Sequence, residues 1–217
     1  MANTFAPFGF RSFGTLEGNS PTYGLTRRYL ATSDTNVYFT GDVVQLSTGS
    51  GAGRGFITVP TTGGPAVTTP INGIFAGCEF FSPQVGRVVW SSFFPGNLGN
   101  SSNPCNAYVI EGEDNLFLVQ CTTTAVVGTS QVGANFGFTT GETGSSQSGG
   151  NQTTGISNIA LLSSVFTDLS SQTFRLVDTT SNYFPPGTNG SDGTSAGAIV
   201  VVSFNNQQRR TLTGPSS

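Results

Sequence analysis

The chain has 217 residues, a formal net charge of −3 and only 9% charged residues, and it contains no histidine. Its eight basic residues are all arginines, so lysine is absent as well. Composition therefore excludes Ser-His-Asp and Cys-His catalysis, histidine-ligated zinc, Schiff-base lysines and Walker-type nucleotide loops. The negative charge and the lack of a basic stripe also argue against a nucleic-acid partner.

Length and composition favour one ordered β domain. β-Sandwiches and β-barrels often reach this size undivided, and 18 phenylalanines provide large apolar faces that require burial. Disordered chains combine low hydrophobicity with high net charge, which this chain lacks. We expect a β domain over residues 26–210, preceded by an extended N-terminal arm over 1–25 and followed by a disordered tail over 211–217.

The predicted arm carries aromatic anchors in an irregular setting rich in glycine and proline. Their spacing fits neither a helix nor an alternating strand, so the segment is expected to be extended. The arm either packs on its own domain or reaches a neighbouring subunit, and the sequence leaves both alternatives open. The residues concerned are Phe5, Phe8, Phe10, Arg11 and Phe13.

Apolar runs between turn residues predict strands along the rest of the chain, with little helical signal. This pattern predicts an all-β fold, a single β-barrel or β-sandwich with long Gly/Ser loops. The low-complexity residues 139–155 are interpreted as a flexible surface insert. Residues 156–162 form either a further strand, which we favour, or one short helical turn. The other predicted strands are 37–46, 56–60, 71–81, 87–92, 107–111, 116–121, 132–138, 173–177 and 198–204.

Three polar clusters superficially resemble sites of chemistry. Glu111, Glu113 and Asp114 form the densest acidic group, but their spacing fits a solvated turn better than the facing carboxylates of a glycosidase. The glycine-rich residues 49–55 lack the following helix that a dinucleotide site needs. Residues 189–193 lack the alternating acids of a calcium loop. We predict turns at all three, with no catalytic, cofactor or metal site.

Cys78, Cys105 and Cys121 are an odd number without CxxC spacing, so no disulfide framework is expected. Cys78 and Cys121 are interpreted as small core residues, because no nearby cation would lower a thiol pKa. The first residues do not resemble a signal peptide, and no apolar run is long enough to span a membrane. We expect synthesis in a reducing cytoplasm and no membrane partner.

Neighbouring aromatic residues on the predicted strands indicate a subunit interface. Adjacent residues of a strand point to opposite faces, so the two rings of Phe80–Phe81 or of Phe93–Phe94 cannot both lie in one core. The second ring of each pair must be covered by a loop, a terminus or another subunit. Together with Trp90, these pairs favour an oligomer.

Seven short motifs follow one another along almost the whole chain. They are Pro7–Arg11, Thr40–Val44, Gly73–Cys78, Phe117–Gln120, Val132–Asn135, Phe174–Leu176 and Ile199–Asn205. In this order the chain resembles the head-decoration (capsid cement) proteins of tailed bacteriophages. Each motif alone is short and degenerate, so the resemblance depends on their order.

The resemblance implies a compact β domain, usually a homotrimer, that binds the major capsid protein outside the mature shell and braces it against packaged DNA. It places the protein on the virion surface after synthesis in the host cytoplasm. The contacts would fall to the Phe-rich arm, the arginine pairs and the outward phenylalanines. These candidate contact residues are Phe5, Phe8, Phe10, Arg11, Phe13, Arg27, Arg28, Phe81, Phe94, Arg209 and Arg210.

Two other function classes remain open on the sequence alone. A phage tail-fibre or carbohydrate-binding β domain would display Trp90 and tyrosines to a saccharide. A glycosidase would use Glu111 and Glu113, since carboxylate chemistry needs no histidine.

Overall fold

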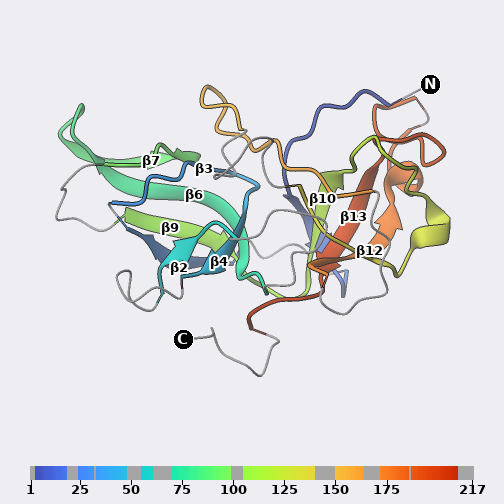
Figure 1. The fold of residues 1–217 in the computed structure, drawn as a ribbon, viewed down its shortest axis with the longest axis horizontal. Coiled ribbons are helices and arrows are strands. Elements are labelled where there is room, and N and C mark those ends of the chain that lie inside the picture. Colours follow the sequence, from blue (N-terminus) through green and yellow to red (C-terminus); the bar gives the residue numbers. More distant parts are fainter. Residues whose placement is uncertain are drawn as a thin grey trace.

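The computed structural model is an all-β protein, as the sequence predicts, and most of its strands form two sheets (Figure 1). Within the described residues the only helical segments are two single 3-10 turns, η1 (Thr129–Gln131) and η2 (Thr180–Asn182). The structure describes residues 3–18, 24–31, 33–47, 55–60, 70–98, 105–139, 150–163, 172–185 and 187–209.

Sheet A is antiparallel and contains both the first and the last strand of the described residues. The first strand lies at one edge, and the last strand lies at the centre because its apolar run can be buried on both faces. Across the sheet the order is β1 (Arg11–Thr15), β10 (Asn115–Gln120), β13 (Ile199–Phe204), β12 (Phe174–Thr179) and β11 (Asn135–Phe136).

Sheet B is also antiparallel and is built around the long strand β6 (Gly73–Ser82). Its order is β2 (Leu25–Leu30), β9 (Cys105–Ile110), β6, β4 (Val43–Leu46) and β5 (Ile57–Thr58), with β7 (Arg87–Ser91) paired to the far end of β6. A separate two-stranded ribbon joins β3 (Tyr38–Phe39) to β8 (Phe93–Phe94).

Two hydrophobic cores lie on opposite faces of sheet B. The first core fills the space between the sheets, where Ile74 and Ile110 of sheet B join a cluster of sheet A phenylalanines centred on Phe174. The second core contains Phe75 and Val109, the neighbours of those two residues along β6 and β9. Adjacent strand residues point to opposite faces, so sheet B is a wall shared by both cores.

The predicted N-terminal arm is wrong for residues 10–15. Phe10 is 2% exposed and stacks on Phe174 with ring centroids 4.2 Å apart, so it belongs to the first core. Arg11 pairs with Leu118 at the start of β1, which makes this segment an edge strand of sheet A. This part of the segment therefore packs on its own domain, which is one of the two alternatives that the sequence left open. Deleting it would remove core, so it is not a detachable arm.

Most predicted strands from residue 71 onward are confirmed, with differences at their ends. Two predictions need correction. The strand predicted over 37–46 is two strands, β3 and β4, because the chain turns at Gly41, whose φ of +97° suits glycine. The strand predicted over 156–162 is irregular and makes only isolated bridges at Ile156 and Leu161. The insert predicted over 139–155 lies largely outside the described residues.

Candidate interaction surface

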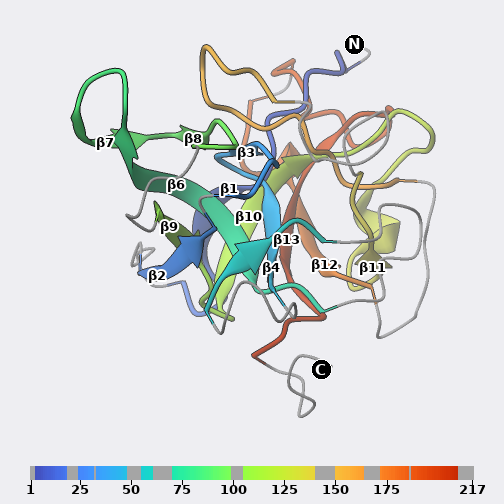
Figure 2. The ribbon, with the colours of Figure 1, turned by 60° about the vertical axis from the view of Figure 1, so that its left-hand side comes forward.

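One face of sheet B is covered along only part of its length. Ile74 and Ile110 on this face are buried in the first core. Further along, where β7 joins β6, the side chains of Trp90 and Val88 are 55% and 60% exposed. Figures 1 and 2 show this end of sheet B, with the β6–β7 hairpin, projecting away from sheet A. An ordered sheet face is therefore left open to solvent.

The strand register places six side chains together on this open face. Glu79 lies opposite Trp90 on one side and opposite Asn106 on the other. Asn106 in turn lies opposite Tyr29, and the next residue of β9 on the same face, Tyr108, lies opposite Arg27. We call this set the aromatic platform: Arg27, Tyr29, Glu79, Trp90, Asn106 and Tyr108.

Contacts within the aromatic platform hold its side chains in place. The Trp90 and Tyr108 rings lie 5.1 Å apart, and the Tyr108 hydroxyl donates a hydrogen bond of 2.9 Å to Glu79 Oε2. That bond raises the pKa of the Tyr108 hydroxyl. Arg27 Nε donates to Asn106 Oδ1 at 3.0 Å, and its guanidinium lies 5.5 Å from the centroid of the Tyr29 ring. The surface is thus ordered before any partner binds.

Gly77 makes room for the indole of Trp90. Its φ is +144°, and a Cβ atom at this position would lie 2.6 Å from Trp90 Cζ2. The β6–β9 register also shifts between Phe75 and Gly77, the mark of a β-bulge that re-aims the strand. The Trp90 ring therefore lies against the backbone of β6, with its outer side exposed.

This arrangement suits binding to another surface. Tryptophan, tyrosine and arginine are the residue types that most often dominate the energy of protein interfaces. The aromatic platform places them beside one cation and one anion, so a partner can match it in both shape and charge. Val85 and Leu25, 56% and 40% exposed, lie at the hairpin and on β2 and add apolar area.

The predicted contact residues do not form one site. Arg27 belongs to the aromatic platform, and Phe81 lies opposite Val88 on the same open face. Phe94 is wrong as a contact residue, because it is fully buried in the second core. Phe10 is wrong for the same reason in the first core.

The remaining predicted contacts lie elsewhere. Phe5 is 46% exposed near the N-terminus. Arg11 packs over the Phe8 ring at 5.0 Å, and the Phe13 ring contacts Tyr183 at 5.2 Å. Arg209 is exposed, whereas Arg210 lies outside the described residues.

The Arg28 side chain, 25% exposed, is paired within its own chain, and Glu111 is wrong as part of a solvated turn. Arg28 Nε and Nη2 donate to the two carboxylate oxygens of Glu111 at 2.6 and 2.7 Å. Asn72 donates to the same carboxylate, and Gln207 Nε2 donates to the Glu111 carbonyl at 2.8 Å. The bond to Glu111 raises the pKa of Arg28. Only residues 112–114 form the turn between β9 and β10.

Asp42 is a buried carboxyl group at the turn between β3 and β4. Its Oδ2 accepts a hydrogen bond of 2.8 Å from the Phe39 amide. Burial raises the pKa of Asp42 to about 7, although hydrogen bonds from Ser157 and Phe39 oppose the shift. This carboxyl group therefore titrates near neutral pH inside the fold.

The cysteines are buried and free, as the sequence predicts. A hydrogen bond with Cys105, together with burial, raises the pKa of the Cys78 thiol, and burial raises that of Cys121 to about 12. All three thiols lie in the hydrophobic cores. The interpretation of Cys78 and Cys121 as packing residues is confirmed.

Comparisons with known proteins identify no relative, so a function has to be inferred from the fold and the aromatic platform. No family model matches the chain, and neither a curated protein nor a solved structure is significantly similar to it. In the part of the chain that the structure describes, no group of three or more His, Cys, Asp or Glu residues could hold a metal ion. The same part contains no helix long and apolar enough to cross a membrane.

Proposed function

We propose that this protein is a structural component of a bacteriophage head, a decoration protein that binds the outer surface of the capsid and stabilises it. The observation that carries this proposal is the aromatic platform, an ordered and exposed sheet face that folding does not explain. Exposed aromatic residues on an ordered strand lower solubility unless a partner covers them. A shell lattice presents the same partner surface many times, so a modest contact is strengthened by repetition.

The positions of the motifs in the fold support the proposal. The segments Gly73–Cys78, Phe117–Gln120 and Ile199–Asn205 coincide with β6, β10 and β13, the central strands of the two sheets. The resemblance to decoration proteins therefore lies in the framework of the fold. The partners of the aromatic platform are then the major capsid protein and, in a homotrimer, a second copy of the chain.

A structural role also agrees with the state of the acidic residues. A glycosidase needs two carboxyl groups facing one cleft. Both carboxylate oxygens of Glu111 are instead bonded to Arg28, and Asp42 lies inside the fold. These groups contribute to packing and leave the aromatic platform as the better candidate for function.

The first test is the number of copies per particle. Quantitative mass spectrometry of purified virions is expected to find the chain at a stoichiometry comparable with that of the shell protein. Cryo-electron microscopy of the same particles should place density for it on the outer surface. A handful of copies, or density at the tail alone, would contradict the proposal.

The second test uses Trp90, the only tryptophan of the chain, as a reporter. Binding to capsids from which the protein has been removed should move its fluorescence to shorter wavelength and protect it from acrylamide. Trp90→Ala should weaken capsid binding in sedimentation assays by roughly 30-fold, the loss of about 2 kcal/mol typical of a central interface residue. Val126→Ala, an exposed apolar residue outside the aromatic platform, is the matched control. Equal binding by both variants would remove the platform from the contact.

A tail-fibre or carbohydrate-binding domain is the second candidate, favoured by the exposed Trp90 indole beside the polar groups of Glu79 and Asn106. It predicts that Trp90→Ala abolishes binding to a glycan array while leaving the particle composition unchanged. Loss of capsid binding without any glycan binding at the platform would decide for the decoration protein.

A further inference from the structure

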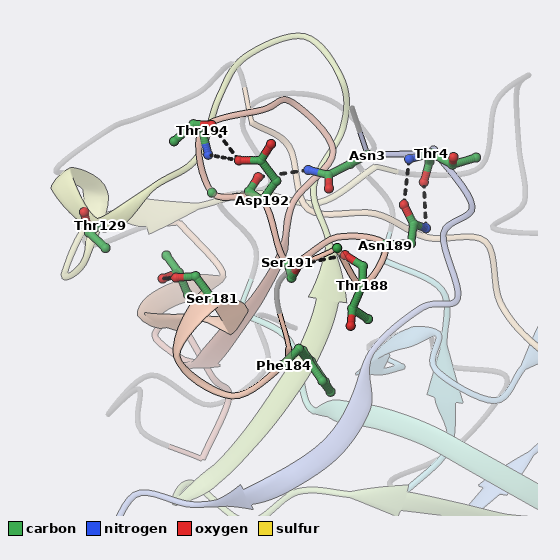
Figure 3. Close-up of a pocket in the computed structure, with 13 residues that line it drawn as sticks. Asn3, Thr4, Thr129, Ser181, Phe184, Thr188, Asn189, Ser191, Asp192 and Thr194 are labelled. Carbon is green, nitrogen blue, oxygen red and sulfur yellow. Dashed lines mark hydrogen bonds between the residues drawn. The ribbon is translucent and has the colours of Figure 1, made fainter. Parts of the chain in front are cut away.

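A hollow lies beyond sheet A, far from the aromatic platform. It has a volume of about 640 Å³, within the usual range for small-molecule sites. Three parts of the chain form its walls: the N-terminal segment at Asn3 and Thr4, the loop over residues 187–194, and the two 3-10 turns at Thr129 and Ser181 (Figure 3). In Figure 1 the N-terminus and β12 lie at the opposite end of the molecule from β7.

Hydrogen bonds fix the walls of the hollow. Asn3 Nδ2 donates to the carbonyls of Asp192, Ser195 and Ala196 at 3.0 to 3.3 Å. The Asn189 side chain pairs with the Thr4 backbone in both directions, accepting from its amide at 2.6 Å and donating to its carbonyl at 3.1 Å. The loop predicted as a flexible turn at 189–193 is thus tied to a distant segment. A site held in this way loses little conformational entropy on binding.

The residues that line the hollow limit the chemical class of ligand that it can bind. Nine of the thirteen lining residues are threonine, serine or asparagine, and no cationic side chain is among them. Among the described lining residues, a phosphate or carboxylate ligand would therefore find no cationic side chain, and it would face the Asp192 carboxylate. Phe184 is the single aromatic residue of the lining. A metal ion would need more carboxylate ligands than Asp192 alone supplies.

A neutral sugar fits each of these features. Its hydroxyl groups both donate and accept hydrogen bonds, as do the hydroxyls and amides that line the hollow. The Asp192 carboxylate accepts from Thr194 and Ser195, and each carboxylate oxygen can accept more than one bond. Hydrogen bonds from the Thr194 and Ser195 hydroxyl groups lower the pKa of Asp192 to about 2, so its carboxylate is an acceptor at every physiological pH. The Phe184 ring can cover the C–H face of a sugar.

We propose that the hollow between Asn3–Thr4 and the 187–194 loop is a binding site for a neutral saccharide. The Asp192 carboxylate accepts hydrogen bonds from its hydroxyl groups, the Asn189 amide donates to and accepts from them, and Phe184 contacts its apolar face. The site is separate from the aromatic platform and does not depend on the proposed capsid contact. The ligand is a free sugar or the terminal sugar of a surface glycan, since both present the same groups.

The test is titration of the full chain with glucose, galactose, N-acetylglucosamine and lactose, followed by saturation-transfer NMR and calorimetry, with sialyllactose as the anionic comparison. At least one neutral sugar is expected to bind saturably and more tightly than sialyllactose. Asp192→Asn should weaken that binding about tenfold, because a charge-assisted bond becomes a neutral one. Asp192→Asn keeps an oxygen for Thr194, so the loop is expected to stay folded.

Two controls separate this site from the rest of the molecule. Asp114→Asn removes the same charge from an exposed turn and should leave sugar binding unchanged. Trp90→Ala should also leave it unchanged, even where capsid binding is lost. A sugar that binds the wild type and Trp90→Ala equally, but Asp192→Asn and Phe184→Ala weakly, supports the site. Failure of the whole neutral panel to bind, or loss of binding in Trp90→Ala, would overturn it.

A second arm of the experiment identifies the source of the sugar. The preferred sugar is offered free and as the terminal unit of an immobilised polysaccharide. This arm rests on the proposed capsid role: stronger retention of virions than of the isolated chain on the polysaccharide indicates a surface glycan bound through many copies. Equal affinity of the isolated chain for both forms, without gain on virions, indicates a small free sugar.

Discussion

One face of sheet B is regularly paired at both of its ends, but the two ends differ in what covers them. At one end Ile74 and Ile110 are buried under sheet A, and at the other Trp90 is 55% exposed and packs against the half-buried ring of Tyr108. The covered end is explained by folding alone, because burial of apolar side chains stabilises the domain. The open end stabilises the fold little, so its ordered aromatic side chains are better explained by a partner.

The largest effect should come from the covered end. Phe174→Ala removes the ring that contacts Phe10, Phe138 and Phe204 in the first core. We expect it to lower the free energy of unfolding by about 3–5 kcal/mol, as for other buried phenylalanines. Chemical denaturation followed by circular dichroism measures the change. A loss below 1 kcal/mol would mean that the covered end is not the stabilising region.

The next effect should come from the buried ion pair beside the turn that joins the two sheets. Arg28→Ala leaves the carboxylate of Glu111, itself 1% exposed, without its cation. We expect a loss of about 3 kcal/mol in unfolding free energy at neutral pH. Arg28→Met combined with Glu111→Gln should be less damaging than Arg28→Ala alone, because no unpaired charge remains. A double variant that is less stable than the single one would contradict this account.

A smaller, pH-dependent effect should come from Asp42 at the covered end. Its pKa is about 7 in the fold against an ordinary value of 3.8, so between these values the folded state holds a proton that the unfolded state has lost. Stability due to this group is therefore fully present below about pH 4 and is lost progressively as pH rises through 7. Thermal unfolding from pH 4 to 8 should show the decline in the wild type and a flatter profile in Asp42→Asn. Identical profiles would contradict the assignment.

The smallest effect on stability should come from the open end. Trp90→Ala removes a large side chain, but one that is 55% exposed. We expect the unfolding free energy to change by less than about 1 kcal/mol, within the range of ordinary surface substitutions. Denaturation under the conditions used for Phe174→Ala makes the comparison direct. A loss as large as that of the core variant would show that the aromatic platform is a structural element of the fold.

Local patterns predicted the all-β class and most strands from residue 71 onward. Two strands near the N-terminus were not predicted, since β1 reads Arg-Ser-Phe-Gly-Thr and β2 contains adjacent arginines, and neither has the apolar alternation of a half-buried strand. These segments are strands because β10 and β9 offer free edges to them. Strand pairing between segments that are distant in the sequence therefore outweighed their low local strand propensity.

The candidate sites were harder to predict for a related reason. Trp90 stood out as the only tryptophan, but its neighbour Tyr108 comes from a strand that only the register brings beside it. Burial of Glu111 depends on Arg28, 83 positions earlier in the chain. The sugar pocket depends on contacts between Asn3 and a loop almost 190 positions later. Alternation within β9, where Asn106, Tyr108 and Ile110 share a face, was the one local signal of the platform.

The position of sheet B between two cores has a consequence for the motions of the molecule. Opening either core exposes one face of β6 and β9, and exposing both faces requires the whole domain to come apart. The amide hydrogens of Phe75 and Val109, which lie at the centre of this shared wall, should therefore exchange with solvent only through global unfolding. Those of β7, at the free end, should exchange earlier, so a map of exchange rates would trace the boundary between framework and binding face.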